Sequence, residues 1–151
     1  MIKITGDGGH ARVIKSMIDN SKSSPEDWQF IAIGDNKARK MEAKKVEGKF
    51  ATIAHQSAIG YEGMRVGEGS VVMAGVIIQA GAKIGKHCIL NTGCSIDHDC
   101  VVGDFVHIAP NAVLCGNVSV GEGALVGANS TCLPGTKIHP WSTVRAGSVV
   151  K

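Results

Sequence analysis

Aliphatic residues recur at every sixth position through the second half of this 151-residue chain. From Val66 to Val150, fourteen of the fifteen positions reached by that step are aliphatic, and Cys132 is the exception. The residue four positions further on in each unit is small or β-branched, from Ser70 to Ser148. A period of six matches neither the two-residue alternation of a half-buried strand nor the 3.6-residue turn of a helix. It is typical of hexapeptide repeats, and it predicts a mainly β fold, a parallel β-helix.

The predicted coil is regular along its length. About three hexapeptides close one turn, so residues 66–149 supply 14 units, or between four and five turns. Ile53 and Ile59 extend the pattern backwards if one residue is inserted before Val66. Because no long loop interrupts the later repeats, one coil offers flat faces and no pocket of its own. We therefore expect sites in grooves between the coils of a homotrimer, with a monomeric structural prism as the alternative.

The start of the chain follows a different pattern, which predicts a small α/β cap. A short strand over residues 2–5 runs into the loop Gly6-Asp-Gly-Gly-His-Ala11, and a helix is expected over residues 12–19. Glycines before a helix let the backbone approach a phosphate, and the helix start favours anions. The loop is therefore a candidate nucleotide-binding turn.

The cap is shorter than a complete dinucleotide-binding unit. A second strand over residues 29–33 and a basic helix over residues 37–45 precede the coil. The polar segment 19–28 has no strand pattern, although a full unit would place a strand there. We expect a truncated Rossmann-like, nucleotide-sugar-binding cap over residues 1–52 and a β-helix domain over residues 53–151.

The basic helix allows two interpretations. Its cations could contact phosphates, but a solvent-facing helix surface is the commoner meaning of such a run. The residues concerned are Lys37, Arg39, Lys40, Lys44 and Lys45.

Composition excludes several other classes of protein. Charged residues make up 19% and hydrophobic residues 44% of the chain, which is too apolar for a disordered protein. No apolar run approaches the roughly 18 residues that span a bilayer, and the N-terminal sequence is not a signal peptide. We therefore expect a cytoplasmic protein without membrane contact. A net charge of +3 and only 4% aromatic residues give no basis for nucleic-acid binding.

The cysteines are expected to be structural. Cys88, Cys94 and Cys100 occupy the small inward position of consecutive units, and no two cysteines are 18 residues apart, the spacing of stacked neighbours. Thiols that pack as small hydrophobic groups explain this pattern better than zinc ligands or disulfides do.

Histidines near the middle of the coil are the candidate chemical groups. His98 lies at a corner between Asp97 and Asp99, and His107 follows nine residues later. A carboxylate beside an imidazole orients the ring and stabilises the imidazolium, as in a general base. A solvated turn is the alternative interpretation. A zinc site that uses His87, His98 and His107 is disfavoured, because spacings of 11 and 9 place them on different faces.

Motifs from both parts of the chain together resemble a known family. They are the Gly-Gly-His turn, Ile31-Ala-Ile-Gly-Asp-Asn36, His55-x-Ser-Ala, and Asn91-Thr-Gly-Cys-Ser-Ile-Asp-His-Asp99 followed by His107. In this order they resemble the NeuD/PglD-type sugar O- and N-acetyltransferases of the left-handed β-helix superfamily, over nearly the whole chain. The resemblance implies a left-handed coil, although the general crossover rule favours the right hand. It also implies acetyl-CoA as co-substrate, no metal, and a homotrimer with sites at subunit interfaces.

The resemblance further implies roles for individual residues. His98 matches the catalytic base, and Asp99 matches the carboxylate that raises its basicity, for which Asp97 could substitute. The positions that match the acetyl-CoA groove are His107, Gly116, Ala128 and Ala146. The positions that match contacts to the acceptor sugar or its nucleotide are Gly8, Gly9, His10, Gly34 and Asn91.

These residues predict an acetyl-CoA-dependent acetyltransferase that acts on the amino group of a nucleotide-linked amino sugar, of the UDP-4-amino-deoxysugar type, used in glycan biosynthesis. Two alternatives remain open: O-acetylation of sialic acid, and a non-catalytic trimeric scaffold that binds a nucleotide sugar. The chain departs from the family pattern in two places. The cap lacks a strand that bears on the nucleotide contacts, and the chain ends in Ser148-Val-Val-Lys151 where Gly-x-Pro-Ala-Lys is common.

Overall fold

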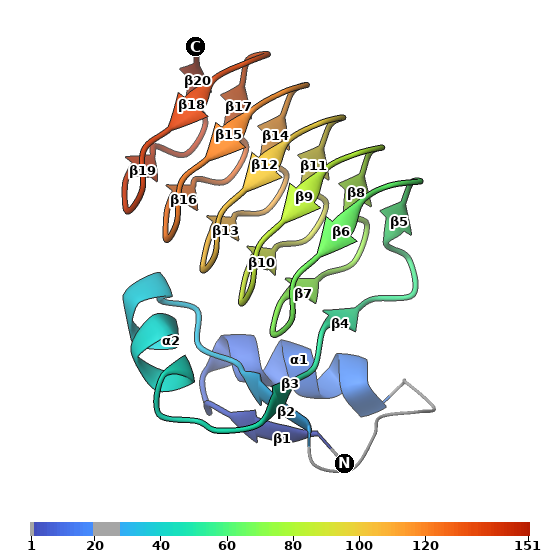
Figure 1. Ribbon diagram of the computed structural model, residues 1–151, viewed down its shortest axis with the longest axis vertical. Helices are drawn as coiled ribbons and strands as arrows, with labels where there is room; N and C mark the ends of the chain where they lie inside the picture. The colour runs from blue at the N-terminus through green and yellow to red at the C-terminus, as the bar shows by residue number, and fades with distance from the viewer. Residues whose placement is uncertain (1, 20–27) are drawn as a thin grey trace.

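The computed structural model describes residues 2–19 and 28–151, which form a small α/β cap followed by a long coil of short strands (Figure 1). The cap consists, in chain order, of β1 (Lys3–Thr5), α1 (Gly9–Asp19), β2 (Trp28–Ile31), α2 (Asn36–Ala43) and β3 (Lys49–Phe50). The three strands form one parallel sheet in the order β1-β2-β3. Residues 49–50 therefore close the cap sheet instead of entering the coil. The expectation that no strand lies between the first helix and the second strand concerns residues 20–27, which are outside the described residues.

The coil consists of two-residue strands that stack into three parallel sheets, the faces of a prism. Face A contains β4 (Ile53–Ala54), β7 (Val71–Val72), β10 (Ile89–Leu90), β13 (His107–Ile108), β16 (Leu125–Val126) and β19 (Thr143–Val144). Face B contains β5 (Ile59–Gly60), β8 (Ile77–Ile78), β11 (Ser95–Ile96), β14 (Val113–Leu114), β17 (Thr131–Cys132) and β20 (Val149–Val150). Face C contains β6 (Arg65–Val66), β9 (Lys83–Ile84), β12 (Val101–Val102), β15 (Ser119–Val120) and β18 (Lys137–Ile138).

Residues stack at intervals of 18 along each face, as the period predicts. His107, for example, pairs with Ile89 in the preceding turn and with Leu125 in the next. The second residue of each strand points into the prism, and from Ile78 to Val126 none of these residues is more than 4% exposed. The small position of each repeat fills the space between them, and most of these residues are fully buried. The predicted parallel β-helix is therefore confirmed.

Residues of the first turn correct the predicted phase of the repeat. Ile53 and Ile59 pair with outward residues of the next turn, so Ala54 and Gly60 are the ones that face inward. The six-residue step therefore continues without an inserted residue. Met64 fills the space left by Gly60, where a Cβ would come within 2.6 Å of Met64 Cε.

The cap covers face A. Outward residues Val71 and Ile89 of this face are 0% and 1% exposed, because α1 packs on β4 and buries Ile14 there. Outward residues of the other faces are open, since Ile59 on face B and Val101 on face C are 50% and 49% exposed. Figure 1 shows the cap at the end of the coil where the first strands lie, with the C-terminus at the far end. Within the described residues, neither helix is long and apolar enough to cross a bilayer.

Three edges join the faces: edge AB follows face A, edge BC follows face B, and edge CA follows face C. The third residue of most corners has a positive φ, which glycine adopts freely and other residues adopt rarely, Asn and Asp most readily. The non-glycine residues with a positive φ are His87, Asp99, Phe105, Asn111, Asn117, Asn129 and Trp141. Three of them, His87, Phe105 and Trp141, stand on edge CA and are neither Asn nor Asp.

The side chain of Arg39 fastens α2 to edge CA. It is 1% exposed, and its N–H groups donate to acceptors of both cap and coil. The acceptors, at 2.7 to 3.1 Å, are the carbonyl oxygens of His87, Phe105, Ile33 and Gly34 and Oδ1 of Asn36. Neither interpretation of the basic helix holds for Arg39, because its guanidinium is committed to the protein's own carbonyl groups.

Candidate active site

The candidate base lies on edge BC, at the corner that follows β11. His98 Nδ1 is 2.9 Å from Asp99 Oδ2, and because a carboxylate can only accept, Nδ1 carries the proton. The other ring nitrogen, Nε2, is then the free basic atom. Asp97 has a different partner, since its Oδ1 accepts from the backbone N–H of His98 at 2.7 Å. The geometry therefore favours Asp99 over Asp97 as the partner of the imidazole.

Both carboxylates favour the protonated form of His98. The hydrogen bond to Asp99 raises the pKa of His98, and the charge of Asp97 raises it further. The side chains of His98 and Asp99 are 54% and 63% exposed, so the pair is open to a ligand. An exposed imidazole with a raised pKa and one free nitrogen is suited to accept a proton.

Gly116 lies against the imidazole, one turn further along edge BC. A Cβ at this position would come within 2.5 Å of His98 Nε2. The missing side chain therefore lets the ring keep its place. One residue predicted to line the acetyl-CoA groove thus lies beside the candidate base.

Four of the residues predicted to bind the acceptor lie where the cap meets face A. Gly8 and Gly9 follow β1 and Gly34 follows β2, and ligands of α/β sheets bind where the carboxyl ends of parallel strands meet. A Cβ at Gly8 or Gly34 would have no atom within 4 Å, so both positions are open. Gly6 has a conformational role instead, because its φ is +127° and a Cβ there would come within 2.6 Å of Ala32 O.

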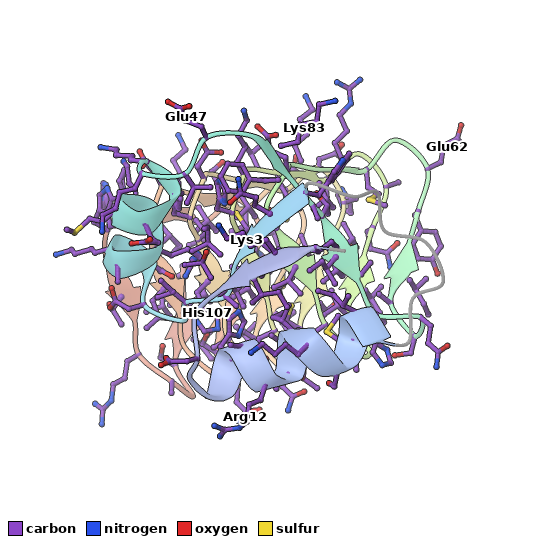
Figure 2. All side chains as sticks on the ribbon, turned by 90° about the horizontal axis from the view of Figure 1, so that it is seen from below. Lys3, Arg12, Glu47, Glu62, Lys83 and His107 are labelled. Atoms are coloured by element: carbon purple, nitrogen blue, oxygen red, sulfur yellow. The ribbon has the colours of Figure 1, made fainter. Side chains whose placement is uncertain are left out.

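His107 lies at the same junction, on face A (Figure 2). Its Nε2 is 3.0 Å from Asn91 Nδ2, and because an amide nitrogen only donates, Nε2 accepts and the proton is on Nδ1. Burial, followed by the charges of Arg39 and His10, lowers the pKa of His107 to about 4. Burial and then Arg39 lower the pKa of His10 to about 4 as well, and within the described residues its buried Nε2 has no hydrogen-bond partner. Both rings are neutral near pH 7, so they can orient a ligand without carrying charge.

A pocket of about 300 Å³ opens at this junction. It is lined by residues 34–37 of the cap and by His107, Leu125 and Trp141 of the coil. A larger pocket of about 360 Å³ lies between α1 and edge AB around His55, and it contains none of the predicted site residues. The junction pocket is therefore the stronger candidate for a ligand.

Within one chain the predicted residues are divided among separate places. His98, Asp99 and Gly116 are on edge BC, Ala128 and Ala146 are on edge AB, and the others are at the cap and face A. Face A borders edges AB and CA, so edge BC is the edge that it does not touch. The prism therefore separates the candidate base from the junction pocket of the same chain.

The histidines considered for zinc lie apart. His87 is on edge CA, where its ring stacks on Phe105 at 5.0 Å and meets Phe50 edge-on at 4.6 Å, whereas His98 is on edge BC and His107 on face A. All five cysteines are free, and four are buried. In residues 2–19 and 28–151 no group of three or more His, Cys, Asp or Glu side chains is arranged to hold a metal ion.

Two residues of the junction were missed in the sequence, Arg39 and Trp141. Arg39 carried no local signal, because it stands in a run of cations. Trp141 carried one, since it occupies the corner position that elsewhere holds mainly Gly, Asn or Asp.

Comparisons with known proteins agree with this geometry. Residues 99–134 match the family model "Bacterial transferase hexapeptide (six repeats)", and residues 57–80 match "Hexapeptide repeat of succinyl-transferase". The perosamine N-acetyltransferase of Caulobacter crescentus, crystallised with CoA and GDP-perosamine, is 34% identical, with a TM-score of 0.92 over 99% of this chain and 88% of that one. The acetyltransferase domain of PglB from Neisseria gonorrhoeae is 25% identical, with a TM-score of 0.91 over 99% of this chain and 90% of that one. The Neisseria domain has also been crystallised with acetyl-CoA.

Proposed function

The chain belongs to the hexapeptide-repeat family of acetyltransferases, and we propose that it transfers the acetyl group of acetyl-CoA to an amino group of a nucleotide-linked amino sugar. The observation that carries the proposal is the His98–Asp99 pair, whose free Nε2 is exposed beside Gly116. The acceptor class is supported by the open glycine loops of the cap and by the Caulobacter enzyme, whose structure contains GDP-perosamine.

In the proposed reaction His98 Nε2 takes a proton from the sugar amine while the amine nitrogen attacks the thioester carbonyl. A C–N bond forms, the C–S bond breaks, and the same proton passes from His98 to the leaving thiolate. Asp99 holds the ring by Nδ1 and stabilises the imidazolium formed in between. The reaction needs a base and an oriented acceptor, and it needs no covalent enzyme intermediate.

A second copy of the chain would complete the site. We propose a homotrimer of left-handed coils in which edge BC of one subunit faces the junction pocket of its neighbour. The outward row of face B, from Ile59 to Val149, has no charged residue, whereas face C carries Arg65, Lys83 and Lys137. Face B ends at edge BC, so packing it against another subunit would bring His98 to the interface.

The proposal is tested by incubating the protein with acetyl-CoA and a panel of acceptors while free thiol is measured. The panel contains UDP-linked and GDP-linked 4-amino sugars, the corresponding 4-hydroxy sugars, and sialic acid. Thiol release with an amino sugar supports the proposal. Release with sialic acid alone would replace it with O-acetylation, and no release with any acceptor would favour a binding scaffold.

Activity should depend on the protonation of His98. Only the neutral imidazole accepts a proton, so we expect kcat/KM to rise with pH through a midpoint above about 6.5, the ordinary histidine pKa. Asp99→Asn removes the main cause of the raised pKa and should move that midpoint to lower pH. Asp104→Asn on edge CA is the matched control. An unchanged midpoint in Asp99→Asn would contradict the assigned partner.

Gly116 separates effects on catalysis from effects on folding. In Gly116→Ala the new Cβ would meet the end of an exposed side chain, so the His98 ring should move and stability should change little. A displaced base should lower kcat by about 100-fold. At Gly67 a Cβ would come within 2.6 Å of the Gly85 backbone, so Gly67→Ala should lower the melting temperature instead. Equal losses of stability in the two variants would refute this distinction.

A further inference from the structure

A second hollow adjoins the junction pocket on the outer side of α2. It has a volume of about 280 Å³ and is lined by Lys37, Lys40, Met41, Lys44 and Trp141, which we call the Trp141 patch. Lys37 and Trp141 line both hollows, so the surface is continuous from His107 to Lys44. Met41 is 63% exposed and Trp141 36%, which is unusual for apolar side chains of this size.

The indole ring of Trp141 is held in place and leaves part of its surface open. Gly123 lies beneath the ring, where no Cβ would fit. Lys40 Nζ lies 5.1 Å from the centre of the ring and is also paired with Glu122. The backbone of Trp141 has a φ of +60°, a conformation that a bulky residue rarely adopts. A fixed and exposed aromatic ring is a surface on which a planar base can stack.

Charge around the ring favours an anionic ligand. Glu122 neutralises Lys40, whereas no carboxylate of the described residues pairs with Lys37 or Lys44. Two unpaired ammonium groups therefore flank the indole. An aromatic base joined to phosphates matches this combination of groups, and a purely apolar or a cationic ligand does not.

We propose that the Trp141 patch is a subsite for the nucleotide part of a substrate, with the base on the indole and the phosphates between Lys37 and Lys44. This inference rests on the proposed function, because both proposed substrates contain a nucleotide diphosphate. The two sources are the nucleoside diphosphate of the acceptor sugar and the 3′-phospho-ADP of CoA. Either would reach the junction pocket by way of Lys37.

The test measures binding by calorimetry, with GDP, UDP, 3′,5′-ADP and inorganic pyrophosphate as probes. We expect Trp141→Asn to weaken binding of one class of nucleotide by about 5- to 150-fold, the effect of losing one base–aromatic stack, and to leave pyrophosphate unaffected. Lys37→Gln combined with Lys44→Gln should weaken the same nucleotide by about 2- to 30-fold and flatten its salt dependence. Loss of 3′,5′-ADP binding identifies the CoA source, and loss of GDP or UDP binding identifies the acceptor.

The chain supplies matched controls for these variants. Asparagine occupies the equivalent corner position with a positive φ at Asn111, Asn117 and Asn129, so Trp141→Asn should fold normally. Lys45 is paired with Glu42 outside the patch, and Lys45→Gln should bind every probe as the wild type does.

Two results would overturn the proposal: no nucleotide binds the wild type at millimolar concentration, or the Trp141 and lysine variants bind all probes unchanged. Thiol release measured on the same samples keeps the two proposals distinct. Turnover with unaltered nucleotide binding in Trp141→Asn refutes the subsite alone. Nucleotide binding that depends on Trp141 without turnover refutes the acetyltransferase proposal and leaves the subsite.

Discussion

Replacement of His98 by alanine is expected to lower kcat for acetyl transfer by about 100- to 10,000-fold, the usual contribution of a general base. The reason is the position of Nε2, the only ring nitrogen left free once Nδ1 donates to Asp99. KM should change little, because the residues proposed to bind the acceptor lie on other parts of the prism. Steady-state thiol release with the best acceptor of the panel measures both constants.

The matched control for this prediction is His139→Ala, because His139 is an exposed histidine on edge CA away from Asp99. The melting temperature of both variants should stay near that of the wild type, since neither imidazole is buried. Full activity in His98→Ala would remove His98 from the mechanism. Equal loss in both variants would point to a general effect of removing a surface imidazole.

Mixing two inactive variants tests whether the site is shared between subunits. His98→Ala lacks the proposed base, and His10→Ala lacks a group of the proposed acceptor site. If each site takes one residue from each of two neighbouring chains, co-assembled variants should recover about a quarter of the wild-type sites. If one chain holds the complete site, mixed oligomers should stay inactive.

The repeat predicted the coil well because every turn states the same constraint. Inward aliphatic positions recur every six residues, so one misplaced residue does not alter the fold. The first turn was phased wrongly because Ile53 and Ile59 are aliphatic but point outward, and only the pairing with the next turn decides between the two phases. The separation of His98 from His107 could be predicted, because nine residues are half a turn of the coil.

Contacts between cap and coil could not be predicted in the same way. They depend on how two units dock, which no local pattern encodes. Arg39 stood in a run of cations, yet it is buried against the carbonyl groups of His87 and Phe105. The nearest local signal is the presence of His87, Phe105 and Trp141 at corners that otherwise favour Gly, Asn or Asp, since such residues need a reason to adopt a positive φ.

Arg39 has no carboxylate partner at hydrogen-bond distance in the described part of the chain, and its five bonds go to neutral oxygens. Burial lowers its pKa to about 10, the mark of a cation held in place against a desolvation cost. Two of its acceptors, Ile33 O and Gly34 O, belong to the loop that lines the junction pocket. The guanidinium therefore couples the position of that loop to the coil.

Arg39→Met should consequently destabilise the docked cap by about 3 kcal/mol, because buried carbonyl groups on both sides of the contact lose their donor. With a urea dependence of about 2 kcal/mol/M, the unfolding midpoint should fall by about 1.5 M. Trp28 in β2 and Trp141 on the coil provide fluorescence from the two sides of the contact. Arg12→Met on the exposed side of α1 should shift the midpoint by less than about 0.3 M. Arg39→Lys should lie between them, since an ammonium keeps the charge but cannot span acceptors on both units. A midpoint for Arg39→Met equal to that of Arg12→Met would show that the cap is held by its apolar contacts alone.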